Sequence, residues 1–215
     1  MIIPSDTQTP TPSFPHVCIG AVTAPIIARL EAKYEDLDSQ AQAFVNAGPS
    51  RARRTLRIAQ LIFAQAIGER YGIAPEGIGL ASKASGAPRL IVADKDEPIL
   101  HISVSHSEHA LAVACSPFPI GIDIEEKRTL PTRPITLLFS AKEQTSITDD
   151  DSFTCAWVRK EAYAKWQGTG LNDSLADGIY DTPTHIIRYH LGRQILYMGL
   201  AGTRCHDACI VEWEL

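Results

Sequence analysis

Residues 120–125 read Ile-Gly-Ile-Asp-Ile-Glu, and this alternation predicts a β-strand with one apolar and one acidic face. Period-two spacing sends the three isoleucines to the core and places Asp123 and Glu125 together on the other face, with Cα atoms about 7 Å apart. Neighbouring carboxylates repel each other and need a compensating cation. Mg²⁺ suits them because it takes carboxylate oxygens and keeps positions for phosphate and water. An exposed strand end beside Lys127 and Arg128 explains the same residues equally well.

A helix predicted over residues 152–167 supplies a third carboxylate. Trp157, Glu161 and Lys165 are spaced i, i+4 and i+8 and share one helical face, with Lys160 beside Trp157. A carboxylate flanked by two lysines suits a site for metal and phosphate. The alternative is an ordinary salt bridge between Glu161 and Lys165 on a solvated face, worth about 0.3 kcal/mol.

An upstream helix carries a basic N-terminus. Ser50 is a good N-cap, the apolar positions keep near-helical spacing, and Gly72 closes the run. The first two turns contain Arg51, Arg53, Arg54 and Arg57. The N-terminus of a helix is already partly positive, so these arginines are unfavourable there unless an anion binds. The alternative is a solvated basic face whose small penalty is tolerated.

Other segments indicate a mixture of strands and helices. Strands are predicted at residues 17–22, 102–105 and 110–115, and a helical region with acidic interruptions at 24–44. The tail, residues 186–215, is expected to form hairpin strands around 191–192 and 201–202.

A faint internal repeat favours two similar halves. Residues 108–113 resemble residues 205–211, and each reads as a short polar turn that feeds an apolar strand.

Composition describes an ordinary globular chain and excludes one class of protein. The chain has 215 residues, 45% of them hydrophobic, and its 20 Lys+Arg against 25 Asp+Glu give a net charge of -5. A chain of this size buries on the order of 70% of its unfolded surface, so its core needs no disulfide or metal. The negative charge excludes a generally basic nucleic-acid coat, so any anion site must be local.

Cysteine usage and the N-terminus predict a cytoplasmic protein. Five cysteines without paired short spacings do not resemble a secreted disulfide framework. Residues 1–15 contain four prolines and no Lys or Arg, which predicts a flexible lead-in rather than a secretory signal. No run approaches the roughly 20 apolar residues of a membrane span, so no membrane partner is expected.

Four motifs, taken in order, resemble those of the 4'-phosphopantetheinyl transferases. They are residues 103–107 (SVSHS), 119–125 (PIGIDIE), 139–143 (FSAKE) and 157–165 (WVRKEAYAK). Together they fall within residues 101–171, about a third of the chain, and residues 54–56 (RTL) in the upstream helix also resemble the family. The length is similar to the surfactin-synthetase-activating type, a monomer of two similar halves, rather than to the shorter trimeric type.

The resemblance implies a Mg²⁺-dependent transfer of 4'-phosphopantetheine from coenzyme A to a serine of an apo acyl, polyketide or peptidyl carrier protein. Adenosine 3',5'-bisphosphate is the other product. By motif position, Asp123, Glu125 and Glu161 hold the metal. Lys160 and Lys165 contact the pyrophosphate or orient the acidic site.

The resemblance also places Ser105 and His106 at the coenzyme A phosphates, with Arg54 nearby. Glu161, or Glu143 acting directly or through water, is the expected base for the carrier serine. Ser140 and Glu143 also form a capping-box sequence, and capping is an equally good explanation of Glu143.

The sequence departs from the family upstream of the SVSHS motif. Relatives carry Gly-Lys-Pro there, whereas this chain has Ala87 between Gly86 and Pro88, so Arg89 or Lys83 is expected to replace the lysine. The basic residues that often precede the Arg-Thr-Leu helix are also missing, and Arg51 and Arg53 are candidates for their work. A zinc cluster of His101, His106 and His109 is not expected, because a strand and a turn scatter them.

The predicted fold is α+β, with two pseudo-symmetric halves that each contain a small, mostly antiparallel sheet packed by helices. The expected boundaries are residues 1–15 for the lead-in, 16–116 for the first half and 117–215 for the second, metal-binding half, with the active site in the cleft between the halves. Two other functions remain open: a metal-dependent phosphoanhydride hydrolase, and a non-catalytic module that binds coenzyme A or carrier protein.

Overall fold

The computed structural model describes residues 13–83, 87–93, 100–132, 135–136, 139–170, 178–179 and 182–213. Its strands are β1 (His16–Ala21), β2 (Ile78–Ser82), β3 (Pro88–Val92), β4 (His101–His106), β5 (Ala110–Ser116), β6 (Ile120–Glu126), β7 (Thr184–Leu191), β8 (Gln194–Gly202) and β9 (Cys209–Glu212). Its helices are α1 (Ala24–Ala32), α2 (Ser39–Asn46), α3 (Arg51–Arg70), α4 (Ala141–Gln144) and α5 (Asp150–Gln167), with 3₁₀ turns η1 (Tyr34–Asp36), η2 (Pro75–Gly77) and η4 (Cys205–Asp207). The predicted α+β class is confirmed.

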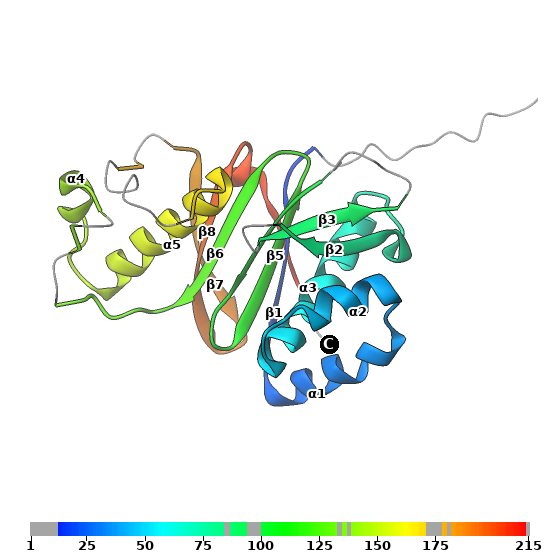
Figure 1. Ribbon diagram of the computed structural model, residues 1–215. Helices are drawn as coiled ribbons and strands as arrows, with labels where there is room; N and C mark the ends of the chain where they lie inside the picture. The colour runs from blue at the N-terminus through cyan, green and yellow to red at the C-terminus, as the bar shows by residue number, and fades with distance from the viewer. Residues whose placement is uncertain are drawn as a thin grey trace, which may run out of the picture.

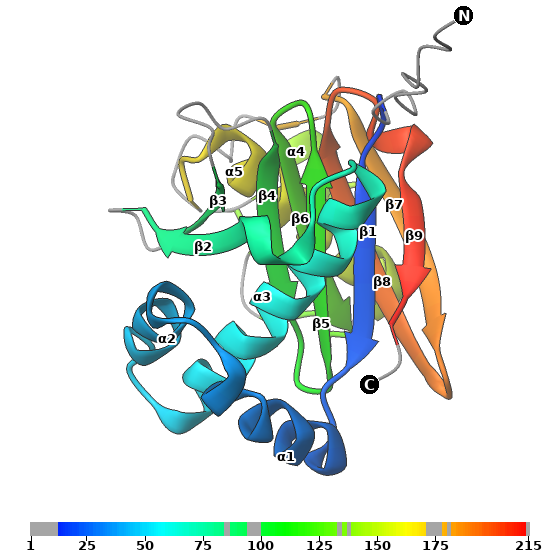
Figure 2. The same cartoon turned by 90° about the vertical axis from the view of Figure 1, so that its right-hand side faces the viewer.

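Two sheets repeat one topology. The first has the strand order β4-β5-β1-β9, and the second has β6-β8-β7. In each, a first strand (β1 or β6) is followed by helices and then by a pair of antiparallel strands (β4 and β5, or β7 and β8), and the second member of that pair lies beside the first strand. The exception is β9, which adds to the free edge of β1 in parallel. A separate ribbon, β2-β3, flanks the first sheet (Figure 2).

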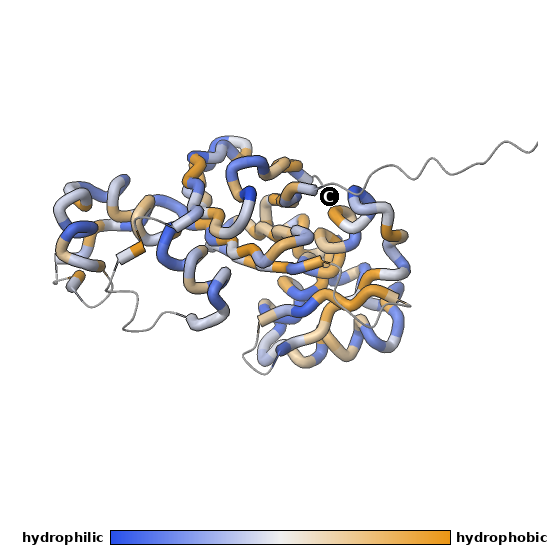
Figure 3. Tube along the Cα trace, turned by 90° about the horizontal axis from the view of Figure 1, so that it is seen from above, coloured by the Kyte–Doolittle hydropathy of each residue, from blue (hydrophilic) through white to orange (hydrophobic). Residues whose placement is uncertain are grey.

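The molecule has four layers, helix, sheet, sheet, helix (Figure 1). The inner faces of the two sheets pack together, with Val17, Ile19, Ala112 and Ala114 of the first against Ile122, Ile124, Met198 and Leu200 of the second. Helix α3 covers the outer face of the first sheet and α5 covers that of the second. Apolar stretches run through the middle of the molecule in the view from above (Figure 3). Of the helices that the structure describes, none is both long and apolar enough to cross a membrane.

The helical region 24–44 is interrupted near its acidic residues, as predicted, because Leu37 is extended and Asp38 caps a new helix by accepting a hydrogen bond from the N–H of Ala41 at 2.8 Å. One prediction for the tail was wrong. The tail forms a hairpin at Gly192 as expected, but β9 does not pair with β8. Both edges of β8 are already occupied by β6 and β7, so the last strand joins β1 instead.

The division at residues 116 and 117 stays a prediction, and residues 1–12 of the expected lead-in lie outside the described residues. The expected boundary lies in the turn between β5 and β6. A polar turn precedes β5 and the turn η4 precedes β9, but both strands lie in the first sheet, and the counterpart of β5 in the second sheet is β8. The faint repeat therefore does not mark the two halves.

Serine side chains join the two sheets where β4 meets β6. The hydroxyl oxygens of Ser103 and Ser105 accept hydrogen bonds from the backbone N–H groups of Ile122 and Ile124, each at 3.1 Å. Both serines are buried, and their two-residue spacing places them on the same face of β4. The Ile-Ser-Val-Ser alternation thus holds the edges of the two sheets together by side-chain rather than ladder hydrogen bonds.

Two glycines set how closely α5 lies on the second sheet. A Cβ at Gly121 of β6 would overlap the backbone of Ala162 and Trp166, and one at Gly199 of β8 would overlap the backbone of Val158. Only glycine permits this approach. The side chains of α5 that face β6 are therefore brought directly over the acidic face of that strand.

Gly121→Ala is expected to lower the free energy of unfolding by about 1–3 kcal/mol, because the added methyl group meets rigid helix backbone rather than a flexible side chain. Urea unfolding measures the change. Gly79→Ala in strand β2 is the matched control, since its Cβ would make ordinary contacts at 3.8 Å. Equal effects of the two substitutions would contradict the close packing of α5.

Candidate active site

Asp123 lies at the centre of the predicted acidic site. It is buried, at 4% exposure, on the face of β6 that α5 covers. Its Oδ1 accepts hydrogen bonds from the hydroxyl of Ser105 and from the ammonium of Lys165, both at 2.7 Å. Its Oδ2 is also buried but accepts no hydrogen bond from any residue that the structure describes. A buried carboxylate oxygen without a donor is unfavourable, and a cation would satisfy it.

Glu125 and Glu161 join Asp123 as an electrostatically coupled trio. Burial raises the pKa of Glu161, and the charge of Asp123 raises it further. Burial also raises the pKa of Glu125. The ion pair with Arg128, at 2.7 Å, lowers this pKa, and the charge of Asp123 raises it. The charge of Asp123 thus disfavours the charged forms of both glutamates, as expected where a cation binds.

The residues present fit Mg²⁺, although the trio is spread out. The orphaned oxygen of Asp123 and the all-oxygen donor set both suit this hard cation. One ligand atom from each of the three carboxylates cannot be chosen so that all lie within 4.8 Å of one another. Like charges repel one another, which favours this wide spacing. Lys165 pairs with Asp123, and Arg128 pairs with Glu125.

A cationic cavity of about 390 Å³ opens beside this trio, between α3, the β2-β3 ribbon and β4. Arg53, Arg57, His106 and Lys165 line it, and Arg53 Nη1 lies 3.0 Å from His106 Nε2. Partial burial, followed by the charges of Arg53 and Lys165, lowers the pKa of His106. The ring is therefore neutral at pH 7 without an anion, and a bound phosphate would favour its protonated form.

A second cavity of about 300 Å³ continues past Lys165. Lys83 and Arg89, the two expected substitutes for the missing lysine, both line it, together with His101 and Trp166. Lys165 borders both cavities, so it lies between the basic surfaces and the carboxylate of Asp123.

Arg54 lies elsewhere. It lines a different cavity with Glu31, Tyr34 and Arg51, while Arg53 is the arginine that contacts His106. Successive helical residues are rotated by about 100°, so adjacent arginines face different surroundings. The spacing of Arg53 and Arg57, i and i+4, could have singled out the pair that shares the cavity.

Glu143 and Lys160 form a buried ion pair at 2.9 Å. Oε2 of Glu143 also accepts hydrogen bonds from the N–H and hydroxyl of Ser140, at 2.8 and 3.0 Å, and Oε1 accepts from the N–H of Ile179 at 3.3 Å. Lys160 is 1% exposed and lies near the ring of Phe139. The predicted capping box is confirmed. The structure thus gives these two residues contacts that tie α4 to α5, whereas Glu161 and Lys165 face Asp123.

Comparison with known proteins agrees with the motifs. Residues 119–203 match the sequence model of the 4'-phosphopantetheinyl transferase superfamily. The chain is 30% identical over 127 residues to a 4'-phosphopantetheinyl transferase of Bacillus subtilis, and 29% identical over 131 residues to 4'-phosphopantetheinyl transferase psf-1 of Bacillus pumilus. It is 28% identical over 127 residues to 4'-phosphopantetheinyl transferase Sfp of Bacillus subtilis strain 168.

These alignments cover 56% to 58% of this chain and 54% of each relative, so the chain spans about half the length of the curated relatives it matches. The resemblance drawn from the motifs is confirmed for the matched part. That part contains Asp123, Glu125, Glu143, Glu161 and Lys165.

Proposed function

We propose that this chain, whose residues 119–203 match the superfamily model, transfers 4'-phosphopantetheine from coenzyme A to a serine of an apo carrier protein. One observation carries the proposal beyond the family match. Lys165 pairs with the buried Asp123 at 2.7 Å and lines the cavity that holds Arg53 and His106. Lys165 therefore places a basic surface next to a carboxylate site, and cations close to a metal site suit a reaction at a phosphoanhydride.

Asp123, Glu125 and Glu161 would hold Mg²⁺. The ion would neutralise negative charge that gathers on the phosphate oxygens as the bond is exchanged. Without it, three carboxylates would repel the pyrophosphate. Ser105, whose hydroxyl donates to Asp123 and accepts from the N–H of Ile124, positions the Asp123 carboxylate in this proposal.

Arg53, His106 and Lys165 would bind the phosphates of coenzyme A. Their side chains line one cavity, and an arginine fork, an imidazole and an ammonium are all suited to phosphate oxygens. Lys83 and Arg89 extend the basic surface beyond Lys165 and would contact a further phosphate group. Arg54 and Lys160, which the resemblance also places near phosphate, have other neighbours here and are secondary candidates.

The carrier serine attacks the phosphorus that bears the pantetheine arm. Its oxygen forms a new P–O bond, the phosphoanhydride bond breaks, and adenosine 3',5'-bisphosphate leaves with that bond's electron pair. Glu161 would accept the serine proton at a carboxylate oxygen that does not bind the ion, the role that the resemblance implies for it. Glu143 is the second candidate for the base. Both of its carboxylate oxygens already accept hydrogen bonds or pair with Lys160, so Glu161 is the better candidate.

The proposal extends to partners and compartment. The five cysteines are free thiols, which suits a reducing cytoplasm. We infer that the chain acts as a monomer on coenzyme A and an acyl, polyketide or peptidyl carrier, without nucleic acid or membrane. With a net charge of -5, it would repel an acidic carrier, so docking would depend on a local basic or apolar surface.

The test is the intact mass of a purified apo carrier protein after incubation with this chain, coenzyme A and Mg²⁺. A gain of one phosphopantetheine group is expected, and chelation of Mg²⁺ should abolish it. Consumption of coenzyme A at the same rate without carrier would instead indicate a phosphoanhydride hydrolase. Binding of coenzyme A with no gain on several carriers, and no hydrolysis, would overturn the proposal in favour of a binding module.

A further inference from the structure

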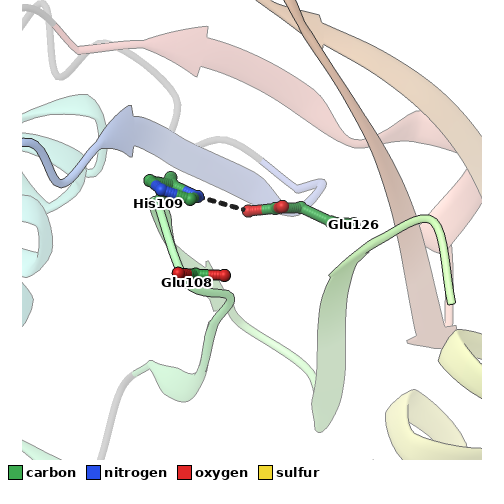
Figure 4. A group of neighbouring side chains, drawn as sticks. All are labelled: Glu108, His109 and Glu126. Carbon is green, nitrogen blue, oxygen red and sulfur yellow. Dashed lines mark hydrogen bonds and ion pairs between the residues drawn. The ribbon is translucent and has the colours of Figure 1, made fainter.

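We propose that Glu108, His109 and Glu126 form a Zn²⁺ site separate from the Asp123 trio. One oxygen of each glutamate and one ring nitrogen of the histidine all lie within 4.8 Å of one another (Figure 4). His109 Nδ1 is 2.9 Å from Glu126 Oε1. Among the residues that the structure describes, this is the group of at least three His, Cys, Asp or Glu side chains whose ligand atoms lie this close together. The inference does not depend on the proposed function.

The three ligands come from two elements that the fold holds in place. Glu108 and His109 occupy the turn between β4 and β5, and Glu126 is the last residue of β6. The turn is fixed by two backbone hydrogen bonds, from Val22 N–H to the carbonyl of His109 at 2.7 Å and from Ser107 N–H to the carbonyl of Ala110 at 2.9 Å. The ligands are therefore presented by anchored backbone rather than by a long loop.

Strand geometry separates this site from the trio. Side chains alternate along β6, so Glu126 points to the face opposite Asp123 and Glu125. That face carries Ile122 and Ile124 and packs on the first sheet, and Glu126 lies at its end. The glutamate thus reaches across the boundary between the sheets to the turn of the other sheet.

The charge at this cluster favours a cation. The hydrogen bond to Glu126 raises the pKa of His109, so without a metal the imidazolium offsets one of the two glutamate charges. The adjacent basic residues pair elsewhere, Lys127 with Asp151 at 3.3 Å and Arg128 with Glu125 at 2.7 Å. A bound divalent ion would satisfy both glutamates and the imidazole nitrogen together, whereas protonation of His109 supplies only one positive charge.

The donor set indicates the kind of metal. Zn²⁺ binds imidazole nitrogen and carboxylate oxygen at about 2.0–2.2 Å, commonly in four-coordinate sites, whereas Mg²⁺ prefers oxygen ligands throughout. Three protein ligands leave a fourth position for water. His109 and Glu126 are 45% and 35% exposed, so an ion can enter from solvent.

A bound ion would connect two elements of the candidate site. The β4–β5 turn begins directly after His106, and β6 carries Asp123. Zn²⁺ at this cluster would therefore fix the turn that follows His106 to the strand that carries Asp123.

The test is Zn²⁺ content after equilibrium dialysis in excess Mg²⁺, with Co²⁺ absorption spectra as a second readout of coordination. Wild type is expected to retain one Zn²⁺ more than His109→Ala, and to give the intense Co²⁺ bands of a four-coordinate site. Loss of a direct ligand should weaken binding at least about 100-fold, the upper end of what outer-shell changes produce. Glu108→Gln together with Glu126→Gln should do the same.

Two control variants make the outcome decisive. His190→Ala removes another exposed histidine, on β7, and should keep the ion. Glu161→Gln alters the trio and should also keep it. Equal Zn²⁺ content in wild type and His109→Ala, at any level, would overturn the site, and loss of the ion in Glu161→Gln would show that it belongs to the trio.

Discussion

Asp123→Asn is expected to lower the rate of carrier modification by about 10³-fold or more at saturating coenzyme A. Asparagine has the size of aspartate and can still accept hydrogen bonds from Ser105 and Lys165, but it loses the negative charge that would hold the metal. A metal ion supplies several kcal/mol of charge stabilisation in such reactions, and each 1.36 kcal/mol is tenfold in rate. Mass spectrometry of the carrier product over time measures the loss, and circular dichroism verifies the fold.

The matched control is Asp207→Asn, in the turn η4. This aspartate is 51% exposed and pairs with Arg204 at the surface. Its substitution should leave the rate within twofold. Asp123→Asn with full activity at limiting Mg²⁺ would remove Asp123 from the metal site, whatever the control shows.

Lys160→Met is expected to lower the free energy of unfolding by about 3–5 kcal/mol. The change removes one partner of a buried ion pair and leaves the Glu143 carboxylate, whose side chain is 9% exposed, without its cation. Backbone donors at Ser140 and Ile179 compensate only part of that charge. Urea unfolding followed by circular dichroism gives the change in stability. Lys33→Met, at an exposed lysine after α1, should change it by no more than about 0.5 kcal/mol.

The same variants separate a structural from a catalytic role for this pair. If Lys160→Met keeps full stability but weakens coenzyme A binding, Lys160 contacts phosphate as the resemblance implied, and the structural role is wrong. Glu143→Gln with normal stability and a lost catalytic rate would assign the base to Glu143. We expect instead that Glu143→Gln lowers stability and that Glu161→Gln lowers the rate without doing so.

Local periodicity predicted which acidic and basic side chains of the candidate site share a face of their own element. The alternation of residues 120–125 places Asp123 and Glu125 on one face, and helical spacing places Glu161 and Lys165 on one face of α5. In the structure these two faces meet, because Gly121 and Gly199 let α5 lie directly on the second sheet. The four motifs also pointed to the family that the comparisons support.

Contacts between different helices and strands could not be predicted from the sequence. Neighbouring arginines of α3 differ only in rotation about the helix axis, and the packing of α3 on the first sheet decides that Arg53 and not Arg54 meets His106. The buried ion pair joins Glu143 to Lys160, 17 positions apart, and a hydrogen bond joins Ser105 to Asp123, 18 positions apart. Neither contact follows from local periodicity, because each depends on how two elements pack against each other.

The sequence by itself determined the elements, the facing of their side chains and the chemistry they carry, because these follow from backbone geometry within a few residues. Tertiary structure alone decided which cations meet which carboxylates, that β9 joins β1, and that Glu108, His109 and Glu126 converge. The physical reason is that such pairings depend on which sheet edges remain free and how closely the layers pack, and neither is encoded in any short stretch of residues.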